Sequence, residues 1–110
     1  MRDRRYATIS LAMKAGAVVS GETAVQEAVR GSKACLIVLA EDASDNTKKK
    51  FYNKSKYYCV PCIEFGEKEM LGHCIGKDQR SVLAVTNESL AKALKEEIRR
   101  NLVDGENQDI

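Results

Sequence analysis

Residues 34–40 read Ala-Cys-Leu-Ile-Val-Leu-Ala, an unbroken apolar run of strand length. A strand that faces water on one side alternates apolar and polar residues, so a run without alternation predicts a strand covered on both faces. The chain must then supply elements to cover each face of the sheet around this strand. Because 110 residues are about the size of one domain, we expect these elements to share one core.

The flanking sequence alternates helix and strand patterns. Helices are predicted over residues 3–15, 21–30, 48–58, 67–75 and 88–102, and strands over 17–20, 34–40, 60–64 and 81–85, the third strand also being covered on both faces. Ser20 and Asn87 are the expected N-caps of the second and last helices, and Gly76 ends the fourth. These patterns predict an α/β fold: a three-layer α/β/α sandwich with a mixed four-stranded sheet, spanning residues 1–102 and followed by a disordered tail at 103–110.

Charge is unevenly spread along the chain. Residues 1–56 hold eleven Lys and Arg against six Asp and Glu, whereas residues 57–110 hold seven against ten. An anionic partner would therefore dock on the first half. The N-terminal sequence has no apolar run of signal-peptide or membrane-span length, which indicates a cytoplasmic protein without a membrane partner.

Cys59 and Cys62 form a Cys-x-x-Cys motif, which can be half of a zinc site or a thioredoxin-type redox pair. Zinc would need two further ligands, and His73 and Cys74 would project about 100° apart on one helix. A redox pair would need the first cysteine at a helix N-terminus, whereas a strand follows here. We expect reduced, ordinary thiols with no metal and no cofactor, and keep a thiol enzyme as a minor alternative.

The segment 72–77, Gly-His-Cys-Ile-Gly-Lys, differs from a phosphate-binding loop in its glycine spacing and in the residue after its lysine. Its glycines are better explained by tight packing and a helix stop. No nucleophile and base pattern surrounds His73, the one histidine, so the sequence predicts neither an enzyme nor a small-molecule substrate. The lysine-rich stretch 48–56 either grips phosphates or forms a solvated helix face.

Six segments with characteristic motifs occur in order along the chain, at residues 18–22, 33–34, 36–44, 46–50, 57–61 and 71–77. Together they resemble the ribosomal proteins that bind kink-turn RNA, the L7Ae/L30e-like superfamily, and most closely its bacterial YlxQ-type branch. The resemblance covers about residues 5–95. It implies an α/β/α sandwich that binds structured RNA and is not an enzyme, with ribosomal or regulatory RNA both open as the target.

The resemblance also implies where RNA would bind. Family members place the N-terminus of the second helix in the widened groove of a sharply bent internal loop, and close the loop before the last strand over a flipped-out base. The implied RNA-binding residues are Ser20, Gly21, Glu22, Thr23, Lys33, Ile75, Gly76, Lys77, Gln79 and Arg80.

Two positions depart from the family pattern. An Asn-Glu pair that reads sheared purines in archaeal and eukaryotic members is Thr23 and Ala24 here, and a lysine one turn into the helix is Glu27. A carboxylate near phosphates is repulsive. A second hypothesis is therefore open: a protein-interaction module of the translation machinery with weak or no RNA affinity.

Overall fold

The computed structural model describes residues 3–108, and side-chain environments through residue 100. Five helices and four strands follow one another in this part of the chain: α1 (Arg4–Lys14), β1 (Val18–Ser20), α2 (Glu22–Arg30), β2 (Leu36–Leu39), α3 (Asp45–Tyr58), β3 (Cys62–Glu64), α4 (Lys68–Cys74), β4 (Val82–Val85) and α5 (Glu88–Gln108). Within these residues, no helix is both long and apolar enough to cross a membrane.

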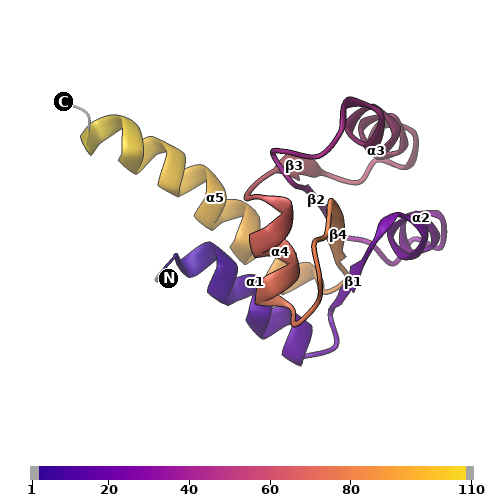
Figure 1. The fold of residues 1–110 in the computed structure, drawn as a ribbon, viewed down its shortest axis with the longest axis horizontal. Helices are drawn as coiled ribbons and strands as arrows, with labels where there is room; N and C mark the ends of the chain where they lie inside the picture. Colours follow the sequence, from indigo (N-terminus) through magenta and orange to yellow (C-terminus); the bar gives the residue numbers. More distant parts are fainter. Residues whose placement is uncertain (1–2, 109–110) are drawn as a thin grey trace.

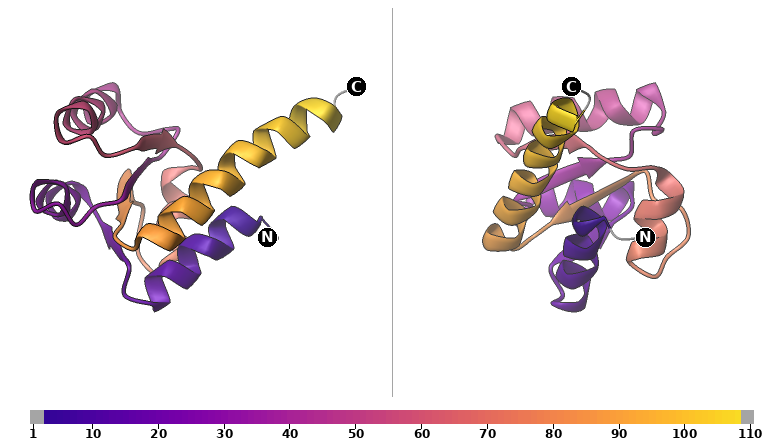
Figure 2. Two further views of the ribbon diagram at one scale, coloured as in Figure 1. Left: turned by 180° about the vertical axis from the view of Figure 1, so that it is seen from behind. Right: turned by 90° about the vertical axis from the view of Figure 1, so that its left-hand side faces the viewer.

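Strand β2 lies in the middle layer of the molecule, with each of its side chains at most 1% exposed. Leu36 and Val38 pack into a core with α1, α4 and α5, while Ile37 and Leu39 pack into a second core with α2 and α3. Figures 1 and 2 show these two groups of helices on opposite sides of the sheet. The predicted three-layer α/β/α sandwich is thus confirmed, and the unbroken apolar run is its cause.

The sheet has the strand order β1-β4-β2-β3. Strand β4 is antiparallel to both of its neighbours, and β2 is parallel to β3, so the sheet is mixed as predicted. Ser20 is paired with Leu83, and Leu39 with Val82. This register brings the ends of β1 and β2 and the start of β4 to one end of the sheet.

The third strand differs from the prediction. Residues 60–64 were expected to form a strand covered on both faces, but β3 starts at Cys62 and lies at the edge of the sheet, with Cys62 and Ile63 half-buried and Glu64 exposed. Pro61 precedes the strand, and its carbonyl oxygen accepts a hydrogen bond from the backbone N–H of Ile37. Proline has no N–H to donate to a ladder, which fits the first position of an edge strand.

Helix boundaries differ at two places. α3 begins at Asp45 rather than at residue 48, because the Ser44 hydroxyl oxygen accepts from the backbone N–H of Thr47 at 3.1 Å and caps the helix. Asn87 caps α5 as predicted, accepting from the N–H of Leu90 at 2.9 Å. α5 continues to Gln108, past the predicted end at residue 102; residues 103–108 contain no proline and so permit helical backbone. Residues 109 and 110 of the predicted tail lie outside the described residues.

The C-cap of α3 yields a first prediction. Cys59 has left-handed backbone angles, φ 57° and ψ 44°. This conformation costs a residue with a Cβ roughly 1–2 kcal/mol. Glycine avoids this cost, but part of the resulting gain in stability is offset because glycine loses more conformational entropy on folding. We expect Cys59→Gly to raise the free energy of unfolding by about 0.5–1 kcal/mol, measured by urea denaturation.

Ala93→Gly, at an exposed position inside α5, is the matched control for this substitution. It should lower stability by about 1 kcal/mol, because glycine is a poor helix former. A similar loss at Cys59 would contradict the strain argument.

Candidate functional site

The pairing of β1 with β4 brings together the two segments that the sequence analysis singled out, residues 20–23 and 75–80. Ser20 ends β1 opposite Leu83, and the N–H of Gly21 donates to the carbonyl of Val82 at 3.0 Å. α2 begins directly after this contact, and the loop between α4 and β4 arrives at the same place. Both segments therefore meet at one end of the sheet.

The start of α2 is formed by Gly21 rather than by Ser20. Gly21 is the N-cap with φ 91° and ψ 155°, a region of backbone space that is essentially restricted to glycine. Within the part of the chain that the structure describes, no side chain caps this helix. The prediction that Ser20 is the cap is wrong, because Ser20 still belongs to β1. The first N–H groups of α2, at the positive end of the helix dipole, are thus left without a side-chain cap.

Glu22 in the first turn of α2 links this helix to α3. Its carboxylate accepts from the Thr47 hydroxyl at 2.9 Å and from Lys50 Nζ at 2.8 Å. The hydrogen bond from Lys50, and after it the one from Thr47, lowers the pKa of Glu22. Thr23 beside it is exposed. Sequence reasoning placed Glu22 in the site but missed both partners, which lie on another helix.

The loop before β4 begins with a Schellman motif that stops α4. The N–H of Gly76, at φ 73°, donates to the carbonyl of His73 at 3.0 Å, and that of Lys77 to the carbonyl of Gly72 at 2.9 Å. Gly76 is therefore the predicted helix stop. Gly72 packs so closely on the loop that an added Cβ would lie 1.8 Å from the carbonyl oxygen of Asp78. Both glycines are thus explained by packing and backbone geometry.

The side chains of this loop point in different directions. Ile75 is buried in the core shared by α1, α4 and α5, so its side chain anchors the loop. Lys77 and Gln79 are exposed. Asp78 between them is exposed as well. The loop therefore offers one cation, one carboxylate and one amide to a partner, while Ile75 can offer only its backbone.

Arg80 fastens the loop to the sheet. Its Nε donates to Ser20 Oγ at 3.1 Å, and its Nη1 donates to the carbonyls of Gln79 at 2.9 Å and Asp78 at 3.3 Å. Its backbone N–H donates to the carbonyl of Lys68 at 3.0 Å. Arg80 thus holds the two halves of the candidate site together, a role that the sequence analysis did not predict when it named Arg80 among the RNA-binding residues.

Lys33 lies away from the other predicted residues. It follows the C-terminus of α2, and its N–H donates to the carbonyl of Ala28 at 2.8 Å. The nine residues of α2 correspond to a rise of roughly 13 Å between the two ends of the helix. The structure therefore brings together the residues at 20–23 and 75–80 but not Lys33.

The lysines of α3 are divided between internal contacts and solvent. Lys48 Nζ lies 3.1 Å from the Glu64 carboxylate and donates to the carbonyl of Glu41 at 2.7 Å, and Lys50 pairs with Glu22. Lys49 and Lys56 are exposed. Some lysines of this helix thus form contacts within the protein, while others face solvent and remain available to a partner.

The cysteines have the environment of ordinary thiols. Burial raises the pKa of Cys62 to about 12 and that of Cys74 to about 11, which opposes thiolate formation at neutral pH. Cys59 lies at the C-terminus of α3, not at a helix N-terminus. Among the described residues, no group of three His, Cys, Asp or Glu side chains is placed to hold a metal ion. These findings weigh against the zinc and redox hypotheses.

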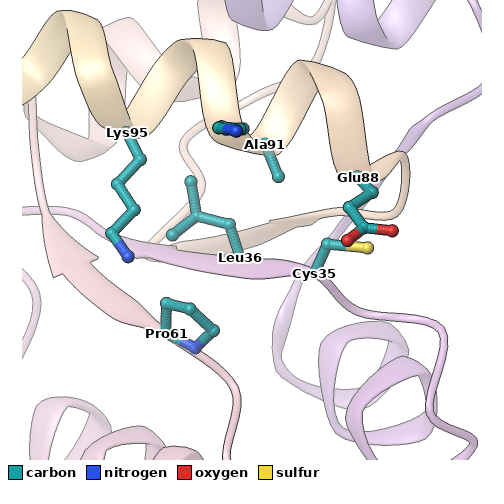
Figure 3. A pocket seen from close by; sticks show the side chains of 7 residues that line it. Cys35, Leu36, Pro61, Glu88, Ala91 and Lys95 are labelled. Atoms are coloured by element: carbon teal, nitrogen blue, oxygen red, sulfur yellow. The ribbon is translucent and has the colours of Figure 1, made fainter.

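A hollow of about 300 Å³ lies between α5 and the starts of β2 and β3 (Figure 3). Leu36, Ala91 and Pro61 form its apolar wall, with Glu88 and Lys95 on α5 at its rim. Cys35 precedes β2 and so lies at the other end of the sheet from the loop before β4. This hollow is separate from the candidate site.

A family model, the ribosomal protein L7Ae/L30e/S12e/Gadd45 family, matches residues 3–95 of the chain. Two curated proteins are similar in sequence. The RNA-binding protein YlxQ of Bacillus subtilis (strain 168) is 43% identical over 89 residues, which are 81% of this chain and 89% of that protein. The RNA-binding protein YlxQ of Enterococcus faecium is 40% identical over 95 residues, 86% of this chain and 91% of that protein.

Solved structures show the same fold. A protein of unknown function from Bacillus halodurans superposes with a TM-score of 0.86 at 32% identity, covering 89% of this chain and 99% of that one. The 15.5kD RNA binding protein of Giardia lamblia superposes with a TM-score of 0.72 at 18% identity, covering 86% of this chain and 82% of that one. These findings confirm the resemblance that the sequence motifs indicated.

Gly72 provides a prediction for the loop geometry. In Gly72→Ala the new Cβ would lie 1.8 Å from the Asp78 oxygen and 2.5 Å from the Asp78 carbonyl carbon, so backbone must move. We expect a loss of about 1–3 kcal/mol in the free energy of unfolding, measured by urea denaturation.

Gly31→Ala is the matched control, because Gly31 has an ordinary φ of −86° and its nearest neighbour would be 3.2 Å away. It should change stability by no more than about 0.5 kcal/mol. Equal effects at the two glycines would show that the close packing of the loop on α4 does not matter.

Proposed function

The chain belongs to the ribosomal protein L7Ae/L30e/S12e/Gadd45 family, and on that premise we propose that it binds RNA, with a kinked, kink-turn-like structured RNA as its target. The curated relatives are named as RNA-binding proteins and not as enzymes, in agreement with the expectation of a non-enzymatic chain. The proposed setting is ribosomal or translation-related RNA in the cytoplasm.

The observation that carries this proposal is the juxtaposition of an uncapped helix N-terminus with a rigid loop. The N–H groups at the start of α2 lack a side-chain acceptor, and the loop of residues 75–80 is fastened beside them through Arg80 and Ser20. Unpaired N–H groups at the positive end of a helix favour phosphate oxygens and other acceptors. The start of α2 and the loop of residues 75–80 lie together at one end of the sheet and form a surface that can contact both sides of a bent RNA.

The individual residues suit different parts of this task. Gly21 has no side chain to keep RNA away from the backbone, and exposed Thr23 and Gln79 can hydrogen bond to base edges. Lys77 supplies a cation for a phosphate. Distorted RNA exposes base edges that regular A-form RNA hides, so polar groups of this kind have something to read. Lys33, at the far end of α2, would reach phosphates about four nucleotides away at roughly 3.4 Å per nucleotide.

The carboxylates near this surface bear on affinity. Glu22 is neutralised in part by Lys50, whereas Glu27, further along α2, and Asp78, in the loop before β4, are exposed. Glu27 lies four residues after Thr23 and thus on the same helix face. Its charge would repel phosphates. This observation favours the second candidate function, a protein-interaction module with weak RNA affinity.

Titration of a fluorescent kink-turn RNA against an unkinked duplex of equal length separates the two functions. We expect the kink-turn to bind at least about tenfold more tightly at near-physiological salt with magnesium, a difference of roughly 1.4 kcal/mol. Equal affinity for both RNAs, or no binding to either, would contradict kink recognition. That result would favour the protein-interaction function.

Arg80 allows a sharper test of how the site works. If Arg80 acts by holding the loop against β1, Arg80→Lys should weaken kink-turn binding about as much as Arg80→Ala, because a lysine lacks the planar fork that reaches several acceptors. We expect a loss of roughly tenfold for each, since net hydrogen-bond contributions are about 0.5–1.5 kcal/mol. Fluorescence anisotropy measures the affinities, and circular dichroism checks the fold.

Two further variants complete this experiment. Lys77→Ala should weaken binding through the loss of an exposed cation in the same loop, and Lys95→Ala, on α5 beside the hollow at the other end of the sheet, should not. Full affinity in Arg80→Lys would mean that charge, and not the fastening of the loop, is what Arg80 contributes.

A further inference from the structure

One face of α3 carries an open hollow that the proposed site does not use. Lys50, Asn53, Lys54, Tyr57 and Tyr58 line this hollow of about 610 Å³, which we term the α3 groove. Their spacing along the helix, at three, four, seven and eight residues from Lys50, is that of neighbours on one helix face. A neighbouring face of α3 packs on the sheet through Phe51, which is fully buried.

The tyrosines of the α3 groove have no role in the core. Tyr57 is 80% exposed and Tyr58 37% exposed, and both are outside the two core clusters. Their rings are in edge contact, with centroids 4.8 Å apart and planes at 77°. The pair therefore presents aromatic surface to solvent, and a planar ligand could stack on the exposed ring of Tyr57.

The charge of α3 favours an anionic ligand. The helix carries five lysines and one acidic residue, Asp45. Lys48 and Lys50 pair with Glu64 and Glu22, while Lys54 lines the groove, and among the described residues no carboxylate lines it. Lys50, which lines the groove, is also the residue that bonds to Glu22 at the start of α2. The groove thus begins beside the proposed kink-binding surface, and Tyr57 lies about 10 Å further along the helix, or roughly three nucleotides at 3.4 Å each.

We propose that the α3 groove binds an unpaired RNA strand that flanks the kinked element, with one base stacked on Tyr57 and the backbone phosphates beside Lys50 and Lys54. A basic groove with aromatic rings is the common means of holding single strands without sequence preference, because every base has a flat face. Tyrosine is enriched at protein interfaces but lysine is depleted there, so the two lysines of the groove make a protein partner the weaker fit. The proposal rests on the proposed function for the source of the strand.

The test uses three labelled RNAs: a blunt kink-turn, the same kink-turn with a single-stranded extension of about six nucleotides, and the extension alone. An extension of this length is longer than the ~10 Å between Lys50 and Tyr57. The extension should strengthen binding by the intact chain. Tyr57→Ala should weaken binding of the extended RNA about 5- to 10-fold, at the lower end of measured base stacking, and leave the blunt RNA unchanged. Because Tyr57 is exposed, this variant should fold normally.

Two variants distinguish stacking from charge. Tyr57→Phe keeps the aromatic face and should bind the extended RNA within about twofold of the intact chain. Lys54→Gln should reduce the slope of log K against log salt for the extended RNA by about 0.7, as expected for one phosphate contact to a single strand. Lys95→Gln, on α5 beside the hollow at the other end of the sheet, is the control and should leave this slope unchanged.

The outcomes separate this inference from the proposed function. If the blunt kink-turn fails to bind but the isolated strand binds and loses affinity in Tyr57→Ala, kink recognition is wrong and the α3 groove stands. If the blunt kink-turn binds but the extension adds nothing and Tyr57→Ala has no effect, the groove is wrong and the proposed function stands. If a protein displaces the RNA strand from the groove and its own binding requires Tyr57, the proposal that the groove binds RNA would also be overturned.

Discussion

The burial of β2 on both faces is the constraint on which the rest of this structure depends. A strand with apolar side chains on each side is stable only if two separate layers cover it, because each exposed Leu, Ile or Val would forgo about 1.5–3 kcal/mol of burial. The chain meets this requirement with α1, α4 and α5 on one face and α2 and α3 on the other. The helices that cover the sheet must then start and end at its two ends, and the loops that connect them collect there.

The candidate site is a product of this arrangement. α2 and α3 both begin at the same end of the sheet, so Glu22 can meet Thr47 and Lys50 across the gap between two helices. The antiparallel register of β1 and β4 adds the loop before β4 at the same end, where Arg80 reaches Ser20. Neither contact requires an unusual residue. Each follows from strand order and register, which place beside one another segments that are 25 to 28 residues apart, at Glu22, Thr47 and Lys50, and segments that are 60 residues apart, at Ser20 and Arg80.

Local signals were sufficient to predict most of the fold. The apolar run of β2, the stop at Gly76 and the cap at Asn87 act within a few residues, so the sequence alone could locate them. Ser20 was a mistaken cap because strand pairing holds it in β1, and β3 was expected to be covered because position in a sheet is not a local property. The site segments were found by motif resemblance. Local signals could not show that Lys33 is distant from the other site residues or that Arg80 fastens the loop, because both depend on tertiary geometry.

The sheet ends in two very short strands. β1 and β3, its outer strands, each span three residues, and β3 follows a proline and includes exposed Glu64, which pairs with Lys48. An unpaired strand edge is a template on which another chain can add a strand, and short edges with proline and charge are the usual protection against it. Copies of this protein are therefore poorly suited to join edge to edge, and at high concentration the folded chain should resist growth into extended β aggregates.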